Sequence, residues 1–249
     1  MADGIVAVVP CAGRGSRLGF QGPKILAPLG DGRTLWTVMR EKLLRVADSL
    51  VVILSPEGAT QFAPLLSDDP ERDRIHVSLQ ESPTGMAPAI AAGSCNWKEA
   101  KTILVIWGDQ VHVSQNTLER LLRRHSERTG PRVNLPLVEL QTPYVQYLFD
   151  ERHELSEVRE TREGHQVDPV GFSDVGTFLL ENHDLTNLLA EYIQLAPRSV
   201  VTGEINFLPF LVWLAKRGWS VQGFSIADVR EARGVNDQED LQFFRELYR

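Results

Sequence analysis

Cysteine is scarce in this chain, which holds only Cys11 and Cys95 among 249 residues. Two cysteines exclude a disulfide scaffold and a cysteine-rich zinc module, and they are typical of a reducing compartment. No apolar run approaches the ~18 residues that cross a membrane. The amino end carries Asp3 and lacks the basic region of a signal peptide. We therefore expect a cytoplasmic protein that does not act at a membrane.

Basic residues are also in deficit, because 26 Lys and Arg face 33 Asp and Glu and leave a net charge of −7. Such a surface is a poor generic partner for nucleic acid, so an anionic substrate must meet local basic residues. None of the six histidines is paired at a spacing of three or four, so a zinc site is not indicated. The length fits one large domain, residues 1–249, and the sequence carries no signal for an oligomeric state.

The first 125 residues alternate between short, continuous apolar runs and segments with helical spacing. The runs predict strands buried on both faces, and the alternation predicts an α/β fold with a doubly wound, mostly parallel, Rossmann-like sheet. Expected strands are 4–9, 50–54, 75–79 and 102–107, and expected helices are 35–47, 87–94 and 118–125. Ser55–Gly58 is expected to end the second strand as a turn.

The middle of the chain has a different pattern, with short and partly alternating strand candidates. We expect residues 133–200 to form a small, inserted β-rich elaboration on the ligand side of the sheet. The expected strands are 133–138, 144–149, 155–159, 176–180 and 220–225, and the helices are 185–194, 205–216 and 238–248.

A glycine-rich loop follows the first strand, where ligands bind in a doubly wound sheet. Gly13 and Gly15 can adopt a positive φ, which turns successive N–H groups toward one anion. Arg14, Arg17 and Lys24 add three cations, so the loop fits a polyphosphate. The competing interpretation is an ordinary turn with solvated basic residues.

Two familiar phosphate loops do not match this segment. The dinucleotide pattern fails because Leu18 stands where the third glycine belongs, and Ser55 rather than an acidic residue follows the second strand. The P-loop pattern fails because Pro23 separates Gly22 from Lys24.

Ala12-Gly13-x-Gly15-x-Arg17-x-Gly19, followed by Pro23-Lys24-x-Leu26, resembles the signature of the sugar-nucleotide pyrophosphorylases, and most of all their N-acetylglucosamine-1-phosphate uridylyltransferase domains. Later segments match thinly in the same order up to about residue 245. The resemblance implies catalytic roles for Arg17, Lys24 and Asp109. It implies nucleotide binding by Ala12, Gly13, Arg14, Gly15, Gln80, Glu81, Thr84 and Gly85. It implies acceptor binding by Glu160, Asp174, Gly176 and Glu204.

The resemblance also implies a Mg²⁺ cofactor held by Asp109 and Asn236, with Asp237 as a substitute or further ligand. Magnesium prefers oxygen ligands and is bound by few protein groups together with substrate phosphates. The structural alternatives are a turn role for Asp109 and a helix-cap role for Asn236. Cys11 is interpreted as a small filler of the loop rather than a nucleophile.

Two positions depart from the resembling family. Asp174 stands where its members carry the asparagine that helps bind an acetamido group, and an ionised carboxylate only accepts hydrogen bonds, which suits a hydroxyl or an ammonium group. Glu81 stands where a glutamine reads uracil, which favours cytosine, unless the register slips by one residue and Gln80 reads uracil.

The expected partners are a nucleoside triphosphate, with UTP favoured, and a sugar 1-phosphate or similar phosphate monoester. Their condensation would give a nucleotide-activated sugar and pyrophosphate. The alternatives are a cytidylyltransferase that uses a sugar, polyol or amino-alcohol phosphate, a catalytically silent nucleotide-sugar-binding subunit, and a dehydrogenase, which the missing dinucleotide pattern disfavours.

Overall fold

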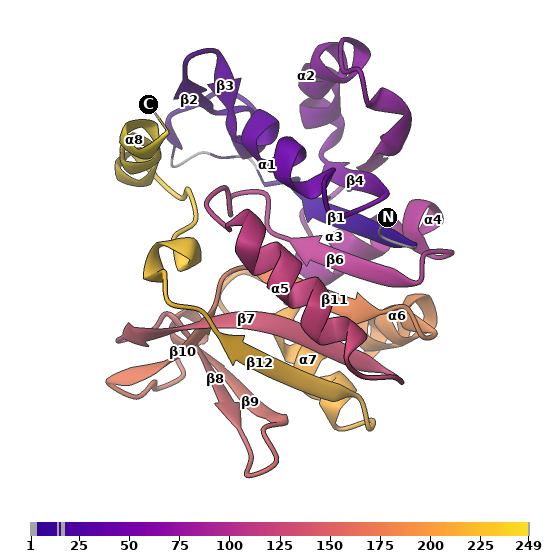
Figure 1. Ribbon diagram of the computed structural model, residues 1–249, viewed down its shortest axis with the longest axis vertical. Helices are drawn as coiled ribbons and strands as arrows, with labels where there is room; N and C mark the ends of the chain where they lie inside the picture. Colours follow the sequence, from indigo (N-terminus) through magenta and orange to yellow (C-terminus); the bar gives the residue numbers. More distant parts are fainter. Residues whose placement is uncertain (1–3, 14, 16–17, 249) are drawn as a thin grey trace.

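The computed structural model describes residues 4–13, 15 and 18–248. Within these residues one ten-stranded sheet runs through the molecule in the order β5-β4-β1-β6-β11-β7-β10-β8-β9, and β12 pairs with β7 (Figure 1). A separate hairpin joins β2 (Pro28–Gly30) and β3 (Arg33–Thr34).

Four parallel strands form the first half of the sheet: β1 (Ile5–Pro10), β4 (Ser49–Leu54), β5 (Ile75–Leu79) and β6 (Thr102–Ile106). Successive side chains of β1 enter opposite cores, since Ala7 and Val9 pack on one face while Val6 and Val8 pack on the other. Burial on both faces explains why this strand is a continuous apolar run. The predicted mostly parallel, Rossmann-like half is therefore confirmed.

Helices cover both faces of the sheet (Figure 1). The core of one face includes side chains of α1 (Leu35–Leu43), α2 (Pro56–Ser67), α5 (Gln115–Ser126) and α8 (Gln238–Leu247). The core of the other includes side chains of α3 (Met86–Ala92), α4 (Ser94–Trp97), α6 (Leu185–Leu195) and α7 (Leu208–Ala215). Short 3₁₀ turns lie at Lys24–Leu26, Arg72–Arg74, Thr161–Glu163 and Val229–Ala232.

The second half of the sheet is mixed. It contains β7 (Arg132–Gln141), β8 (Val145–Phe149), β9 (Leu155–Glu160), β10 (Val170–Asp174), β11 (Thr177–Glu181) and β12 (Ser220–Ser225). The β-rich elaboration thus extends the main sheet at its edge. Strands β10 and β11 both pair with β7, but the register changes by two residues between Asp174↔Leu137 and Leu179↔Asn134. This irregularity places Asp174, Val175 and Gly176 at a bend in the sheet.

Five elements differ from the prediction, namely α2, β2, β3, β10 and α7. The segment after the second strand begins helix α2 instead of ending in a turn: the Ser55 side chain accepts a hydrogen bond from Gly58 N, and Pro56 takes the first helical position. The β2–β3 hairpin and strand β10 were not predicted, because each is short and has little apolar periodicity. The helix expected at 205–216 begins only at Leu208. Among the described residues, no helix is both long and apolar enough to cross a membrane.

Candidate active site

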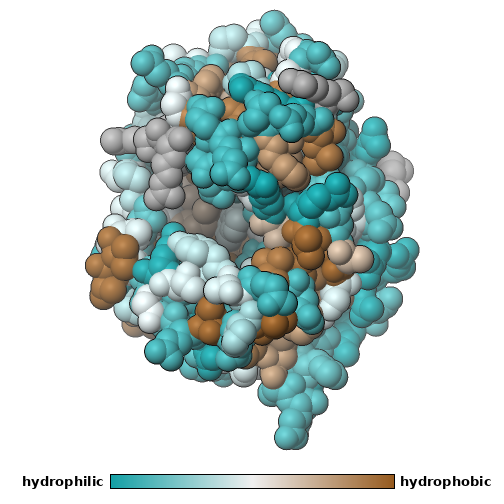
Figure 2. All heavy atoms as spheres, turned by 90° about the vertical axis from the view of Figure 1, so that its left-hand side faces the viewer, coloured by the Kyte–Doolittle hydropathy of each residue, from teal (hydrophilic) through white to brown (hydrophobic). Residues whose placement is uncertain are grey.

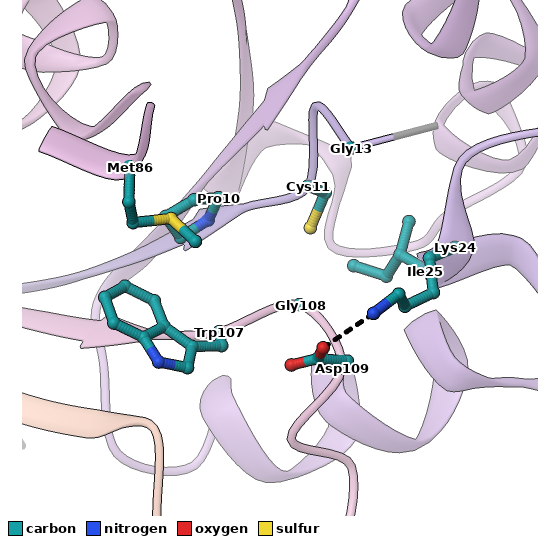
Figure 3. A pocket seen from close by; sticks show the side chains of 9 residues that line it. All are labelled: Pro10, Cys11, Gly13, Lys24, Ile25, Met86, Trp107, Gly108 and Asp109. Atoms are coloured by element: carbon teal, nitrogen blue, oxygen red, sulfur yellow. Dashed lines mark hydrogen bonds and ion pairs between the residues drawn. The ribbon is translucent and has the colours of Figure 1, made fainter. Parts of the chain in front are cut away.

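A cavity of about 170 Å³ opens where the neighbouring parallel strands β1 and β6 end (Figure 3). Its lining residues are Pro10, Cys11, Gly13, Lys24, Ile25, Met86, Trp107, Gly108 and Asp109. The face of the molecule at which these strands end is hollowed between its upper and lower parts (Figure 2). Ligand sites lie at this edge in doubly wound sheets, so the cavity is the candidate active site.

A lysine and two oxygen-bearing side chains from three distant segments meet at the edge of this cavity. Lys24 Nζ donates hydrogen bonds to Asp109 Oδ2 at 2.7 Å and to Asn236 Oδ1 at 3.3 Å (Figure 3 draws the first). Val235 N donates to Asp109 O at 3.0 Å, which fixes the segment before α8 against the β6 loop. The sequence separates these residues by up to 212 positions, and the fold brings them together.

The alternative role considered for Asn236, as the cap of the last helix, is wrong. Asp237 is the cap, because its side chain accepts a hydrogen bond from Asp240 N. The amide oxygen of Asn236 is thereby left to face Lys24. Asp237 is exposed and engaged in capping, which argues against the substitute ligand role considered for it.

The donor set fits a hard cation. Asp109 Oδ2 and Asn236 Oδ1 converge on one positive group, the Lys24 ammonium, and both are oxygen ligands of the kind Mg²⁺ prefers. No group of three or more His, Cys, Asp or Glu side chains suited to a metal occurs in the described part of the chain. A site of this kind would hold a divalent ion by two side chains and complete its shell with substrate phosphates and water.

The glycine-rich loop is only partly described. Gly15 has φ 59°, as expected for a loop that turns its N–H groups inward, whereas Gly13 does not have a positive φ. Arg14 and Arg17 lie outside the described residues. Cys11 is buried, and its loss of hydration together with the nearby Asp109 carboxylate raises the pKa of the thiol. A neutral, buried thiol agrees with the interpretation of Cys11 as a filler.

The predicted base-binding segment folds back on itself. Gln80 Nε2 donates to Gly85 O at 3.0 Å, while Glu81 is exposed. Gly85 has φ 121°, and a Cβ placed there would lie 2.4 Å from Ile205 O and 2.5 Å from Ile205 N. Ile205 N also donates to Thr84 O at 2.9 Å. Gly85 therefore allows this segment to pack directly on the backbone that precedes α7.

A second cavity of about 420 Å³ adjoins the first, because Met86, Trp107 and Asp109 line both. Of the predicted acceptor residues, Glu160 and Asp174 line it, and the buried backbone of Gly176 donates to Asp174 Oδ1 at 2.6 Å. Glu204 is not among its lining residues; Asn206 and Phe207 from the same segment are. The fold thus places two of the predicted carboxylates in one cavity beside Asp109.

Burial shapes the electrostatics of this second cavity. Glu160 is 3% exposed, and desolvation raises its pKa despite the neighbouring Arg162. Desolvation also raises the pKa of Asp174. Sequence reasoning missed Gln110, Arg162 and Asn206, which line the same cavity. The position of Gln110, directly after Asp109, was an available signal; Arg162 and Asn206 lie in irregular segments that offered none.

Comparison with known proteins agrees with this geometry. A family model described as the MobA-like NTP transferase domain matches residues 7–167. The chain is 25% identical to the bifunctional protein GlmU of Bacillus subtilis over 248 residues, which is 96% of this chain and 52% of that protein. It is 27% identical to GlmU of Kineococcus radiotolerans over 237 residues, which is 94% of this chain and 47% of that protein. The chain thus spans about half the length of these curated relatives.

A crystal structure of a Bacillus anthracis protein, assigned as a glucose-1-phosphate thymidylyltransferase and solved with sucrose, has a similar fold. The TM-score is 0.76 and the sequence identity 16%, with 98% of this chain and 94% of that chain covered. At this identity the likeness supports the fold alone, including the helices on both faces of the mostly parallel sheet.

Proposed function

Since the chain belongs to the MobA-like NTP transferase family, we propose that it condenses a nucleoside triphosphate with a sugar 1-phosphate or a similar phosphate monoester. The products are a nucleotide-activated acceptor and pyrophosphate. The observation that carries this proposal is the convergence of Lys24, Asp109 and Asn236 beside the glycine-rich loop. It brings a cation and two metal-type oxygens to the edge of the sheet where phosphates bind.

The chemistry needs no general base from the protein. A phosphate monoester is an anionic nucleophile near neutral pH, so its attack on the α-phosphorus is a matter of alignment and charge neutralisation. Lys24 is placed to neutralise charge on the reacting phosphates, and the adjoining cavities are placed to hold the two substrates on either side of Asp109. Arg17 and the loop amides would hold the leaving pyrophosphate.

Asp109 and Asn236 are the residues that would hold Mg²⁺. The ion, when bound, supplies positive charge shared between the triphosphate and the acceptor phosphate. The Lys24 ammonium donates to one oxygen of each of these side chains, so a cation held by them would lie beside Lys24.

UTP is the favoured triphosphate, and CTP is the alternative. Gln80 is held to Gly85 within the base-binding segment, which supports a uracil-reading glutamine one position before Glu81. The exposed Glu81 carboxylate remains available to accept from the cytosine amine instead.

The test is a matrix of nucleoside triphosphates against sugar, polyol and amino-alcohol phosphates, with pyrophosphate release as the readout. We expect turnover for at least one pair, and only with a divalent ion present. Binding of a nucleotide sugar with no release in any well of the matrix would favour the catalytically silent alternative.

A further inference from the structure

Three side chains of the acceptor cavity bring oxygen atoms that accept hydrogen bonds. Glu160 and Asp174 contribute carboxylates, and Gln110, which is 8% exposed, contributes an amide. Gln110 Oε1 is buried and has no hydrogen-bond donor among the described residues. Buried acceptors without a partner are costly, so the cavity is built for a ligand that donates.

The charge of the cavity is unbalanced. Arg162 Nη2 lies 3.4 Å from Glu160 Oε2, and Arg162 Nε lies 3.5 Å from Glu163 Oε1. Arg162 Nη2 also donates to Asn206 Oδ1 at 2.9 Å. One guanidinium therefore serves two carboxylates, and no ion pair to Asp174 occurs among the described residues. A cationic group bound here would compensate the negative charge that remains.

The bend between β10 and β11 fixes the Asp174 carboxylate. Gly176 N donates to Oδ1, and the Tyr147 hydroxyl is a second, neutral donor beside the same carboxylate, so neither group brings a positive charge to it. The neighbouring Tyr147 is 2% exposed. Burial raises the pKa of Tyr147 far above its ordinary value, and the nearby Asp174 charge adds to this, so the phenol stays neutral and does not offset the charge of the carboxylate.

Aromatic rings form part of the same wall. Trp107 and Phe207 line the cavity and pack edge to face, with their ring centroids 5.6 Å apart. The half-exposed Tyr144 is a further lining residue. Aromatic faces attract ammonium groups, and the attraction adds to that of a carboxylate when the site is desolvated.

We propose that the acceptor is a phosphate monoester that also carries a positively charged ammonium group, held by Asp174, Glu160 and Gln110. This inference rests on the proposed function. The phosphate end of such a molecule faces Lys24 across Asp109, which lines both cavities, and the ammonium end faces the carboxylates. A neutral sugar hydroxyl would satisfy the acceptor atoms but not the excess negative charge.

The test compares matched acceptors that differ only in the cationic group. The pairs are phosphoethanolamine with propyl phosphate, phosphocholine with 3,3-dimethylbutyl phosphate, and glucosamine 1-phosphate with glucose 1-phosphate. With the triphosphate that supports most pyrophosphate release, we expect kcat/KM to be at least tenfold higher for the cationic member of the pair that turns over best. Equal or higher values for the neutral members in every pair would overturn the proposal and point to a polyol or sugar acceptor.

Two variants connect the preference to the cavity. Asp174→Asn keeps an oxygen for Gly176 N, and Glu160→Gln keeps the shape of the side chain; each should bring the ratio of kcat/KM for the cationic member to that for the neutral member within about threefold of unity. The matched control is Asp73→Asn, whose side chain is 96% exposed and distant in sequence from the cavity-lining residues. A preference that survives in both cavity variants would contradict the assignment. Thermal unfolding of each variant checks that the fold is retained.

A direct binding measurement separates failure of this inference from failure of the proposed function. Saturation-transfer NMR with phosphoethanolamine and propyl phosphate, at matched concentrations with the wild-type protein, needs no turnover. Selective binding of phosphoethanolamine that is lost in Asp174→Asn, without pyrophosphate release, would uphold the ammonium site and reject the transferase. Pyrophosphate release with the neutral acceptors alone would uphold the transferase and reject the ammonium site.

Discussion

Two aspartates in the cleft differ in whether a positive charge lies beside the carboxylate. Asp109, after β6, is held by the Lys24 ammonium at 2.7 Å. Asp174, at the bend after β10, receives a backbone N–H but no ion pair among the described residues, and desolvation raises its pKa. The difference teaches that the proposed phosphate end of the cleft carries its own counter-charge at Asp109, whereas at the proposed acceptor end Asp174 has no ion-pair partner among the described residues.

The same contrast extends to how the two ends are built. Asp109 follows a buried parallel strand, and its position is fixed by the regular part of the sheet. Asp174 lies where the pairing of β7 with β10 and with β11 loses register by two residues. Irregular pairing is a usual way to redirect a side chain beside a functional site.

The largest effect is expected at the phosphate end. Lys24→Ala and Asp109→Ala should each lower kcat by about 10²–10³-fold or more, the scale seen when one preorganised charge is removed. Circular dichroism should show a retained fold, since both side chains are partly exposed. The control Lys98→Ala removes a lysine that is 55% exposed and should leave kcat unchanged. Near-normal turnover in either active-site variant would remove that residue from the mechanism.

The predicted base-binding segment should show the next largest effect. If Glu81 reads the base, Glu81→Gln should shift the ratio of kcat/KM for CTP to that for UTP toward UTP by roughly 10- to 100-fold, because a carboxylate that the bound base covers and mispairs costs on the order of 1–3 kcal/mol. The control Glu99→Gln alters a side chain that is 89% exposed. An unchanged ratio would place Glu81 outside the base site and leave Gln80, bonded to Gly85, as the reader.

The phosphate end was the more predictable of the two. The apolar run before Asp109 indicated a buried strand, and carboxyl ends of parallel strands gather at one edge of a sheet, so Lys24 and Asp109 could be placed together from the pattern. The position of Asp174 at the acceptor end could not be predicted in this way. Strand β10 has little apolar periodicity, and the bend at its end arises from the pairing with β7. Arg162 and Asn206 enter the cavity from irregular segments, which leave no periodic signal. Helix α2 was missed although Ser55 and Pro56 carried a start signal.

Gly85 directly precedes Met86, which lines both cavities, so a methyl group on Gly85 should disturb both. In Gly85→Ala the new Cβ would lie 2.4 Å from Ile205 O and 2.5 Å from Ile205 N, both backbone atoms with no easy way to move. We expect a loss of roughly 1–3 kcal/mol in the free energy of unfolding, and a higher KM for both substrates.

The control is Gly130→Ala, where φ is also positive, at 90°, but no atom lies within 4 Å of the added Cβ. Chemical denaturation of the two variants separates the cost of the contact with Ile205 from the cost of the backbone conformation. Equal destabilisation would mean that close packing on Ile205 contributes nothing.

The smallest effect is expected in the stability of Asp174→Asn, and it has a defined dependence on pH. Because desolvation raises the pKa of Asp174 in the folded protein, the folded state holds this proton more tightly than the unfolded state. The contribution of Asp174 to stability is therefore present below its unfolded pKa of about 3.9 and is lost as the pH rises through the raised pKa. The substituted asparagine side chain cannot ionise, so the free energy of unfolding of the variant should exceed that of the wild type by roughly 1 kcal/mol at neutral pH, a typical gain for relieving a strained functional site.

Urea titrations at pH 4 and pH 7 measure this gain, which should shrink at the lower pH. A variant that is less stable than the wild type at pH 7 would show that the carboxylate is already neutralised within the protein, as Asp109 is by Lys24.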